Sequence, residues 1–307
     1  SRLLGNVLSG NIDDYPDGII IPVDKPYRWT SADVVRKIKW TACRHFGKKN
    51  LKVGHAGTLD PLATGVLLVC VGKATRLAET LQKESKEYVA GIAFGATTPS
   101  YDLEKAVDRI YPIDNVSESS VREVLQGFIR EQEQVAPLFS AKSVDGIRAY
   151  ELARKQFKDK GLAKTDVIEG FDHSIAETLN VQKITIHEME LLEFRPGGSS
   201  SAGTLLNPGR VHSRNETVVQ GSDGRINVAD TSGLDLPLAT IRIACGKGTY
   251  IRALARDLGE ALGSGAHLNS LRRTKTGGID VETALSVSQA VSLFITKDQK
   301  TRPGQDS

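Results

Sequence analysis

The sequence is poor in cysteine, methionine and aromatic residues: it has three cysteines, one methionine and 6% aromatics in 307 residues. Cys43, Cys70 and Cys245 are too few and too far apart for a disulfide framework or a zinc site, which favours a reducing compartment, the cytoplasm. No run of about eighteen apolar residues occurs, so no membrane span is expected. The first seventeen residues lack the apolar core of a secretory signal.

A glycine-rich phosphate loop and a regular βαβ alternation are also missing, which disfavours a doubly wound nucleotide-binding enzyme. The net charge of +3 is too small to demand or to exclude a nucleic-acid partner. Basic residues do cluster locally, in residues 44–52 and again at Arg272, Arg273 and Lys275. A solvated charged surface is the ordinary interpretation of such clusters, and composition alone leaves both interpretations open.

Apolar patterns predict mixed strands and helices. Thr30 or Ser31 can cap a helix that carries Val34, Val35 and Ile38 at helical spacing. Ser120 and Glu123 resemble a capping box for a helix that ends near Phe128. Strands are expected at 18–23, 66–71, 87–94, 181–194 and 239–245, and further helical segments at 75–82, 149–158 and 249–262.

One core is expected over residues 18–291, after an N-terminal extension of residues 1–17. Two polar stretches, at about 159–180 and 195–235, are expected to be surface insertions because they hold little apolar material. Residues 292–307 are expected to form a polar tail.

Residues 52–67 carry the strongest chemical signal. Three glycines and Pro61 predict a constrained loop in place of a helix. Asp60 lies in this loop next to an apolar strand, where a carboxylate could serve as a nucleophile or a general base. Taken alone, Asp60 is better explained as an ordinary turn residue, since Asp-Pro is common in turns.

The segment from Gly54 to Leu67 resembles, at every defined position, the G-H-x-G-T-L-D-P-x-A-x-G-V-L signature of TruB-type pseudouridine synthases. A match of this length is far more specific than a short motif. The resemblance implies that Asp60 is the catalytic residue. It also implies that His55 lies against the T-loop of tRNA and helps to accommodate a flipped nucleotide.

Other blocks carry the resemblance through most of residues 18–291, in the family's order. They are Asp24-Lys25-Pro26 with Trp29-Thr30-Ser31, Lys86-Glu87-Tyr88, Pro137 to Arg154, Cys245 to Arg252, and Gly265 to Gly277. The sequence departs from the family pattern in three places. Arg28 stands where glycine is usual, Ala136 replaces a proline, and Ser143 stands where lysine is usual, beside Lys142.

These blocks imply the remaining site residues. Tyr88 would stack on the target base, and Arg252 would pair with the catalytic carboxylate, as a planar guanidinium suits. Arg272 and Arg273 would support the active-site wall or contact phosphate. The other substrate-binding candidates are Lys25, Tyr250 and Leu271, and the candidates for the RNA backbone are Lys48, Lys49 and Lys52.

The resemblance implies an α/β fold of the α+β type, with a mixed, largely antiparallel central sheet and flanking helices. The few residues after Val291 are too short for the family's C-terminal PUA domain, so none is expected. The implied activity is isomerisation of the T-loop uridine at tRNA position 55, after the base is flipped out. No cofactor or metal is expected, the partner is the T-arm of tRNA, and the protein is expected to be a monomer. The carboxylate could attack C1′ or start elimination to a glycal, and the sequence leaves both routes open.

Two alternatives remain. A guide-dependent synthase of the dyskerin type shares this core but also needs a PUA domain and partner proteins. A tRNA-binding folding factor could use the same surface without catalysis.

Overall fold

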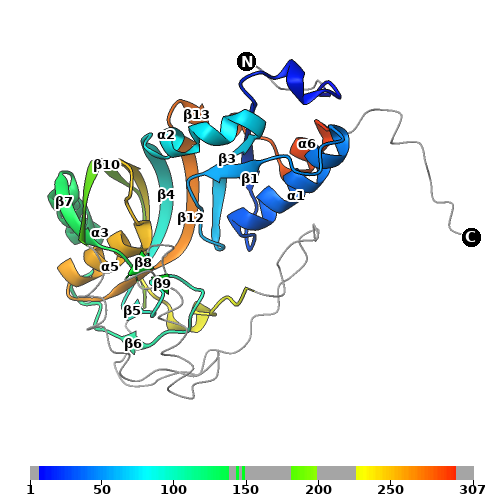
Figure 1. The fold of residues 1–307 in the computed structure, drawn as a ribbon. Helices are drawn as coiled ribbons and strands as arrows, with labels where there is room; N and C mark the ends of the chain where they lie inside the picture. Colours follow the sequence, from blue (N-terminus) through cyan, green and yellow to red (C-terminus); the bar gives the residue numbers. More distant parts are fainter. Residues whose placement is uncertain (1–6, 138–142, 145–146, 149–180, 199–225, 295–307) are drawn as a thin grey trace, which may run out of the picture. The chain divides into compact units, whose positions relative to one another are not determined.

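The computed structural model describes residues 7–137, 143–144, 147–148, 181–198 and 226–294 (Figure 1). Contacts within the chain define two compact units. The first comprises residues 7–84 and 273–294, and the second comprises the described residues between 85 and 272. The helix expected at 149–158, the insertion at 159–180 and most of the stretch 195–235 lie outside the described residues.

The first unit is built around β3 (Ala63–Val71), whose side chains are buried over almost its whole length. β1 (Ile19–Lys25) pairs antiparallel with β3, and β2 (Val53–Ala56) pairs antiparallel with its end. β12 (Ala266–Thr276) is the next strand, and its residues from Arg273 onward belong to this unit. The continuous apolar run of β3 explains this burial, because strands covered on both faces need no polar alternation.

The remaining elements of the first unit are short, apart from α1. They are η1 (Ile12–Asp14), α1 (Ser31–His45), η2 (Gly72–Leu77), α2 (Ala78–Gln82), β13 (Ile279–Asp280), η5 (Val281–Thr283) and α6 (Val287–Ser292).

Helix α1 has the predicted start. Thr30 is its N-cap: the Thr30 hydroxyl accepts a hydrogen bond from Asp33 N at 3.0 Å, and Asp33 Oδ2 accepts one from Thr30 N at 3.0 Å. This reciprocal pair satisfies two backbone donors that a helix start leaves open. Val34 and Ile38 are buried on the inner face of the helix, which leaves its other face to solvent.

The packed part of the first unit extends beyond the boundaries expected for the core. Leu8 and Ile12 are buried, and Leu8 N donates to Leu293 O at 2.7 Å. Phe294 is also buried, with its ring centroid 6.0 Å from that of Phe46. Leu293 and Phe294 therefore pack in the core, because they are apolar residues at the start of an otherwise polar segment.

The second unit has a sheet in the order β12-β4-β11-β10-β7, with β12 contributing its residues up to Arg272. The pairs β4–β11, β11–β10 and β10–β7 are antiparallel. The long strands are β4 (Lys86–Phe94), β10 (Val181–Arg195) and β11 (Leu238–Cys245), and each confirms a predicted strand. The other strands are β5 (Ala96–Thr97), β6 (Arg109–Ile110), β7 (Glu131–Val135), β8 (Ser143–Val144) and β9 (Ile147–Arg148). This sheet agrees with the expected α+β class.

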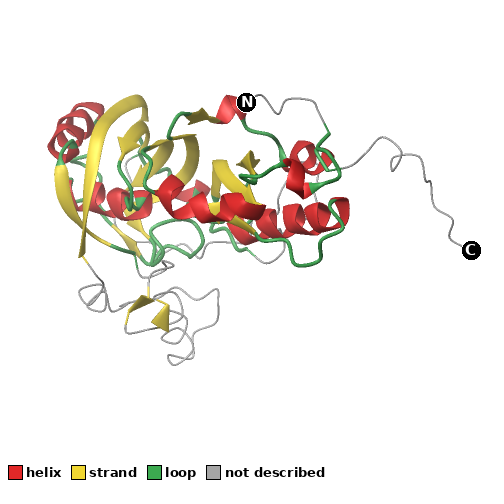
Figure 2. Cartoon of the chain, turned by 45° about the horizontal axis from the view of Figure 1, so that its top comes forward, coloured by secondary structure: helices red, strands yellow, loops and turns green. Residues whose placement is uncertain are grey.

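Two helices, α3 (Glu118–Phe128) and α5 (Ile251–Ala261), contact this sheet, and η4 (Ser232–Leu234) precedes β11 (Figures 1 and 2). The predicted cap of α3 is wrong by one turn. Ser117 is the N-cap, and its hydroxyl accepts from Ser120 N at 3.1 Å, because serine can fill both positions of the box. None of the helices in the described residues is long and apolar enough to cross a membrane.

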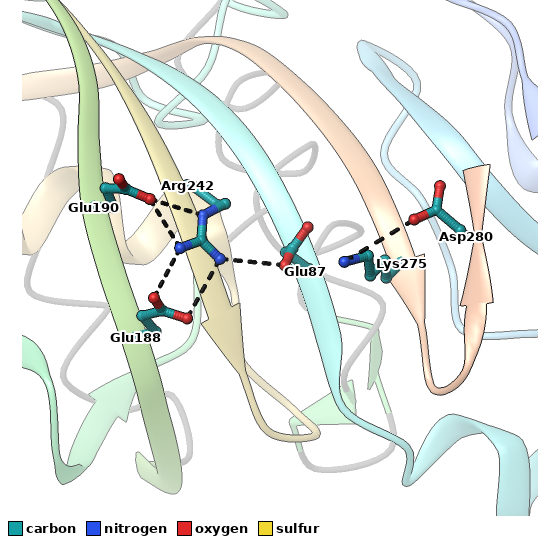
Figure 3. A network of polar contacts seen from close by, with 6 residues as sticks. All are labelled: Glu87, Glu188, Glu190, Arg242, Lys275 and Asp280. Carbon is teal, nitrogen blue, oxygen red and sulfur yellow. Dashed lines mark hydrogen bonds and ion pairs between the residues drawn. The ribbon is translucent and has the colours of Figure 1, made fainter. Parts of the chain in front are cut away.

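The side chain of Arg242 ties three strands of the second unit together (Figure 3). It forms ion pairs with Glu188 at 2.7 Å, Glu190 at 2.8 Å and Glu87 at 3.4 Å, from β10 and β4. A separate pair, Lys275 with Asp280, joins β12 to β13 at 4.0 Å in the first unit. These half-exposed contacts link neighbouring strands, although each contributes little to stability in water.

Candidate active site

Asp60 lies in the first unit, in the loop between β2 and β3, where it is half-buried. Five consecutive carbonyl groups of this loop, from Gly57 to Pro61, each accept a hydrogen bond. A loop whose carbonyls are all satisfied by fixed partners has little freedom to move. The carboxylate of Asp60 is therefore presented from a rigid platform.

Arg273 binds the first part of this loop. Its Nη2 donates to Gly57 O at 3.0 Å, its Nη1 to Thr58 O at 3.4 Å, and its Nε to Val66 O at 2.7 Å. Arg273 is only 1% exposed. Of the two roles expected for Arg273, support of the active-site wall therefore agrees with the structure, and contact with RNA phosphate does not.

Ser31 binds the residue that precedes Asp60. Its hydroxyl accepts from Leu59 N at 2.9 Å and donates to Leu59 O at 3.1 Å, so it satisfies both backbone groups of Leu59. Ser31 was predicted only as a possible helix cap. Its contact with the loop spans 28 residues of sequence and left no local signal.

Gly65 allows β3 to approach β12 directly behind the loop. It has a φ of +107°, and a Cβ built on it would lie 2.1 Å from Arg273 O. Its backbone N also donates to Asp24 Oδ1 at 3.1 Å. Only glycine fits here, which explains in physical terms the glycine in the motif.

Lys25 binds the last part of the Asp60 loop, at the carbonyl of Pro61. Its fully buried ammonium donates to Trp29 O at 2.6 Å, Pro26 O at 3.0 Å and Pro61 O at 3.3 Å. Burial lowers the pKa of Lys25 from 10.5 to about 7, while the nearby charge of Asp60 acts in the opposite direction. These contacts make Lys25 a support for the loop, and its complete burial does not fit the predicted role in binding substrate.

Replacing Lys25 by methionine should make stability less dependent on pH. Between pH 7 and 10.5 the unfolded chain holds a proton on Lys25 that the folded chain has largely released. The wild type should therefore gain stability relative to Lys25→Met as the pH rises through this window. Thermal unfolding at several pH values measures the difference. The exposed Lys37→Met variant is the control. If the difference in stability between the wild type and Lys25→Met does not change with pH, the lowered pKa of Lys25 is wrong.

Arg28 occupies the position where the family usually has glycine. Its backbone is left-handed, with φ of 61°, and its N donates to Pro61 O at 2.9 Å. A left-handed residue other than glycine costs roughly 1 kcal/mol. The usual glycine thus has a conformational reason, and Arg28 keeps the same backbone shape at some cost.

His55 lies on β2, close to the Asp60 loop. Burial, together with the neighbouring charge of Arg273, lowers the pKa of His55 and so favours the neutral form of its ring. Its buried Nδ1 has no hydrogen-bond partner among the described residues. Lys25, His55, Asp60 and Arg273 are thus brought together within one unit.

In the second unit, Tyr250 and Arg252 lie at the start of α5. Gln134 fixes Tyr250 by both backbone groups, because its Oε1 accepts from Tyr250 N at 2.9 Å and its Nε2 donates to Tyr250 O at 3.1 Å. Arg252 is buried, donates to Ser100 O at 3.1 Å and lies 3.8 Å from Asp102 Oδ2.

The remaining candidates lie on two strands of the second unit. Tyr88 is on β4 and Leu271 is on β12, and both are largely buried, whereas Arg272 beside Leu271 is half-exposed. His267, from the same motif as Leu271, is fully buried and contacts Ala96 O through Nδ1 at 2.8 Å. His267 therefore has a structural role.

The structure divides the basic cluster of residues 44–52. Lys48 pairs with Asp13 at 3.2 Å and lines, with Lys52, a cavity of about 610 Å³. Lys49 lines a different cavity, beside α1. His45 is used for packing, since its Nε2 contacts Ser9 O at 2.8 Å and its ring lies against Phe46.

Sequence reasoning missed three residues that contact site residues or the Asp60 loop: Gln134, Asp102 and Ser31. Gln134 lies 116 residues from Tyr250, and Asp102 about 150 residues from Arg252. Contacts over such distances have no local pattern. The described residues contain no cluster of three or more histidine, cysteine, aspartate or glutamate side chains that could hold a metal.

Comparison with known proteins defines the class of enzyme. Residues 44–202 match the family model described as the N-terminal domain of TruB family pseudouridylate synthase, and residues 252–302 match the tRNA pseudouridylate synthase B C-terminal domain. Two structural neighbours show the same fold. The crystal structure of a Cbf5-Nop10-Gar1 complex aligns with a TM-score of 0.53 at 24% identity, and that of an archaeal box H/ACA sRNP Nop10-Cbf5 complex with 0.51 at 22%. These alignments cover 95% and 96% of this chain but only 60% of each neighbour's.

The chain belongs to the TruB family of pseudouridine synthases, which are isomerases. The tRNA pseudouridine synthase B of Phocaeicola vulgatus is 43% identical over 274 residues, which cover 89% of this chain and 92% of that protein. The protein of the same name from Flavobacterium johnsoniae is 36% identical over 279 residues, covering 90% and 96%. The expected family and class of enzyme are therefore confirmed.

Proposed function

We propose that the chain is a tRNA pseudouridine synthase that isomerises the T-loop uridine at position 55, with Asp60 as its catalytic carboxylate. The relatives named tRNA pseudouridine synthase B support the reaction and the kind of RNA. The rigid support of Asp60, whose loop is held at five successive carbonyls, is the observation that carries the catalytic assignment. A catalytic carboxylate needs this preorganisation.

The reaction needs no redox step. The bond between N1 and C1′ breaks, the base turns, a bond forms between C5 and C1′, the proton on C5 leaves to water, and N1 takes up a proton. A carboxylate such as Asp60 can act at the ribose or as a base in this sequence. The RNA gains and loses no group overall, so the reaction itself requires no group-transfer cofactor.

The target uridine lies in a folded loop, so it must leave its stack to reach Asp60. Tyr88 would then stack on the base, and Tyr250, His55 and Leu271 are the further candidates for contact with it. Arg252, which the resemblance pairs with the catalytic carboxylate, is a further proposed member of the site. The T-arm of tRNA would be the bound element, and we propose that a monomer acts in the cytoplasm.

Backbone phosphates of the T-arm are expected to contact Lys48, Lys49 and Lys52, with Arg272 as a further candidate. Replacing the three lysines by alanine should weaken tRNA binding and lower the slope of log affinity against log salt by about 0.7 to 0.9 for each phosphate that the variant no longer neutralises. Filter binding at four salt concentrations measures the slope. An affinity and a slope equal to those of the wild type would contradict this assignment.

The position of the product tests the proposal. The purified chain is incubated with an unmodified tRNA transcript, and pseudouridine is then mapped by carbodiimide labelling and primer extension. One stop at position 55, absent from a transcript with cytidine there, is expected. A stop elsewhere would contradict the site. Activity only after a guide RNA is added would favour a guide-dependent enzyme, and tRNA binding without any product would favour a folding factor.

A further inference from the structure

The outer face of α1 carries an exposed tryptophan with no role in the core. Trp40 is 59% exposed, whereas Trp29, the other tryptophan in the chain, is 4% exposed. Trp40 lines an open cavity of about 550 Å³, together with basic and small residues. This surface, called the Trp40 patch, consists of Arg36, Lys39, Trp40, Cys43, Arg44, Gly47 and Lys49.

Helical spacing places these side chains on one face. Arg36, Trp40 and Arg44 follow each other at intervals of four residues, which aligns them along α1. The guanidinium of Arg44 lies over the Trp40 ring, 4.6 Å from the ring centroid. Val34 and Ile38 fill the inner face, whereas Trp40 lies mostly in solvent, and exposing a large ring to water is unfavourable.

The charge of the patch has one sign. Four of its seven residues are cationic and none is acidic. Arg36 is partly neutralised by Asp33 at 3.1 Å, but Lys39 and Lys49 form no ion pair with any described residue. A surface of this kind favours an anionic partner that also offers a flat apolar group.

We propose that the Trp40 patch binds an unpaired nucleotide of the RNA substrate, at a second site distinct from that of the reacting uridine. A base would stack on Trp40 and Arg44, and Lys39 and Lys49 would contact the adjoining phosphates. Aromatic rings and guanidinium planes both stack on bases, whichever base is present. This inference rests on the proposed function, because that function supplies RNA as the partner.

The fluorescence of Trp40 provides the first test. Trp29 is buried, so quenching by acrylamide reports mainly on Trp40. Adding an unmodified tRNA transcript or a short single-stranded oligouridylate should shield Trp40 from acrylamide. The wild type should show this effect and the Trp40→Phe variant should lose it. A fully paired RNA duplex should shield Trp40 much less, since its bases are already stacked.

Affinity provides the second test. Trp40→Ala should raise the Kd for tRNA about fivefold or more, the range seen when a stacking aromatic is removed. Lys39→Ala should lower the salt slope by about 0.7 to 0.9. Lys37, an exposed lysine of α1 outside the patch, is the matched control, and Lys37→Ala should bind and turn over tRNA like the wild type.

The possible results separate this inference from the proposed function. If the wild type makes pseudouridine in tRNA but Trp40→Ala and Lys39→Ala bind tRNA as tightly as the wild type, the second site is wrong and the function stands. If the wild type neither binds nor isomerises tRNA, the proposed function itself is wrong. Shielding of Trp40 from acrylamide by the single-stranded probe, together with a higher Kd of Trp40→Ala for tRNA, supports the second site.

Discussion

Replacing Asp60 by asparagine is expected to lower turnover by about 10⁴-fold or more, as is typical when a catalytic nucleophile is removed. The amide has nearly the shape of the carboxylate but can neither attack C1′ nor accept a proton. The loop should keep its position, because its contacts with Ser31, Lys25 and Arg273 are made by backbone carbonyls. Single-turnover rates with enzyme in excess, measured beside tRNA affinity, separate chemistry from binding.

The control for this variant is an exposed carboxylate outside the loop. Asp114→Asn removes the same charge in the second unit and should leave turnover unchanged. Asp60→Glu keeps the charge but shifts it by one methylene, so it should also lose most of its activity, since positions within about 0.5 Å matter at such sites. An Asp60→Asn protein with near-normal turnover would return Asp60 to the role of a turn residue.

Replacing Arg273 by lysine is expected to cost both stability and rate. Lysine has a single ammonium and cannot donate to three separate carbonyls in the fixed geometry of a guanidinium. Two of the three carbonyls, those of Gly57, Thr58 and Val66, would then lose charge-assisted hydrogen bonds, at a cost of about 3 kcal/mol. Urea unfolding measures this loss as a lower midpoint.

The same variant should turn over tRNA about 100-fold more slowly, because the freed loop no longer fixes Asp60. The loss should appear in the single-turnover rate more than in the Kd, since Arg273 is buried. Arg122→Lys, an exposed change on α3, should alter the free energy of unfolding by less than about 0.5 kcal/mol. Wild-type stability and rate in Arg273→Lys would show that the guanidinium does not hold the loop.

Local sequence patterns predicted the helices and strands that have one apolar face or that consist of a continuous apolar run. The strands β3, β4, β10 and β11 and the helices α1 and α5 were found because apolar spacing and capping residues are local properties. Strand β12 was missed, although it is 11 residues long. Asn269, Ser270 and three basic residues interrupt its apolar pattern. Strand β2 was missed because its glycine-rich segment favoured a loop.

The sequence predicted the catalytic candidate of the site but not the residues that hold it, because those contacts join distant parts of the chain. The motif resemblance pointed to Asp60, but it could not show that Ser31 binds Leu59 or that Arg273 binds Gly57 and Thr58. These partners lie between 28 and 216 residues from the groups they bind, so folding alone brings them together. The burial of Lys25 and Arg273, which changes their expected roles, is likewise a property of the packed structure.

Tritium release from tRNA labelled at C5 of uridine tests the central claim most directly, because only bond formation at C5 expels that atom. With the purified chain alone, about one equivalent of tritium per tRNA should reach water. Release should disappear with Asp60→Asn and with a transcript that carries cytidine at position 55. If the wild-type chain binds this tRNA and releases no tritium, it does not isomerise the T-loop uridine.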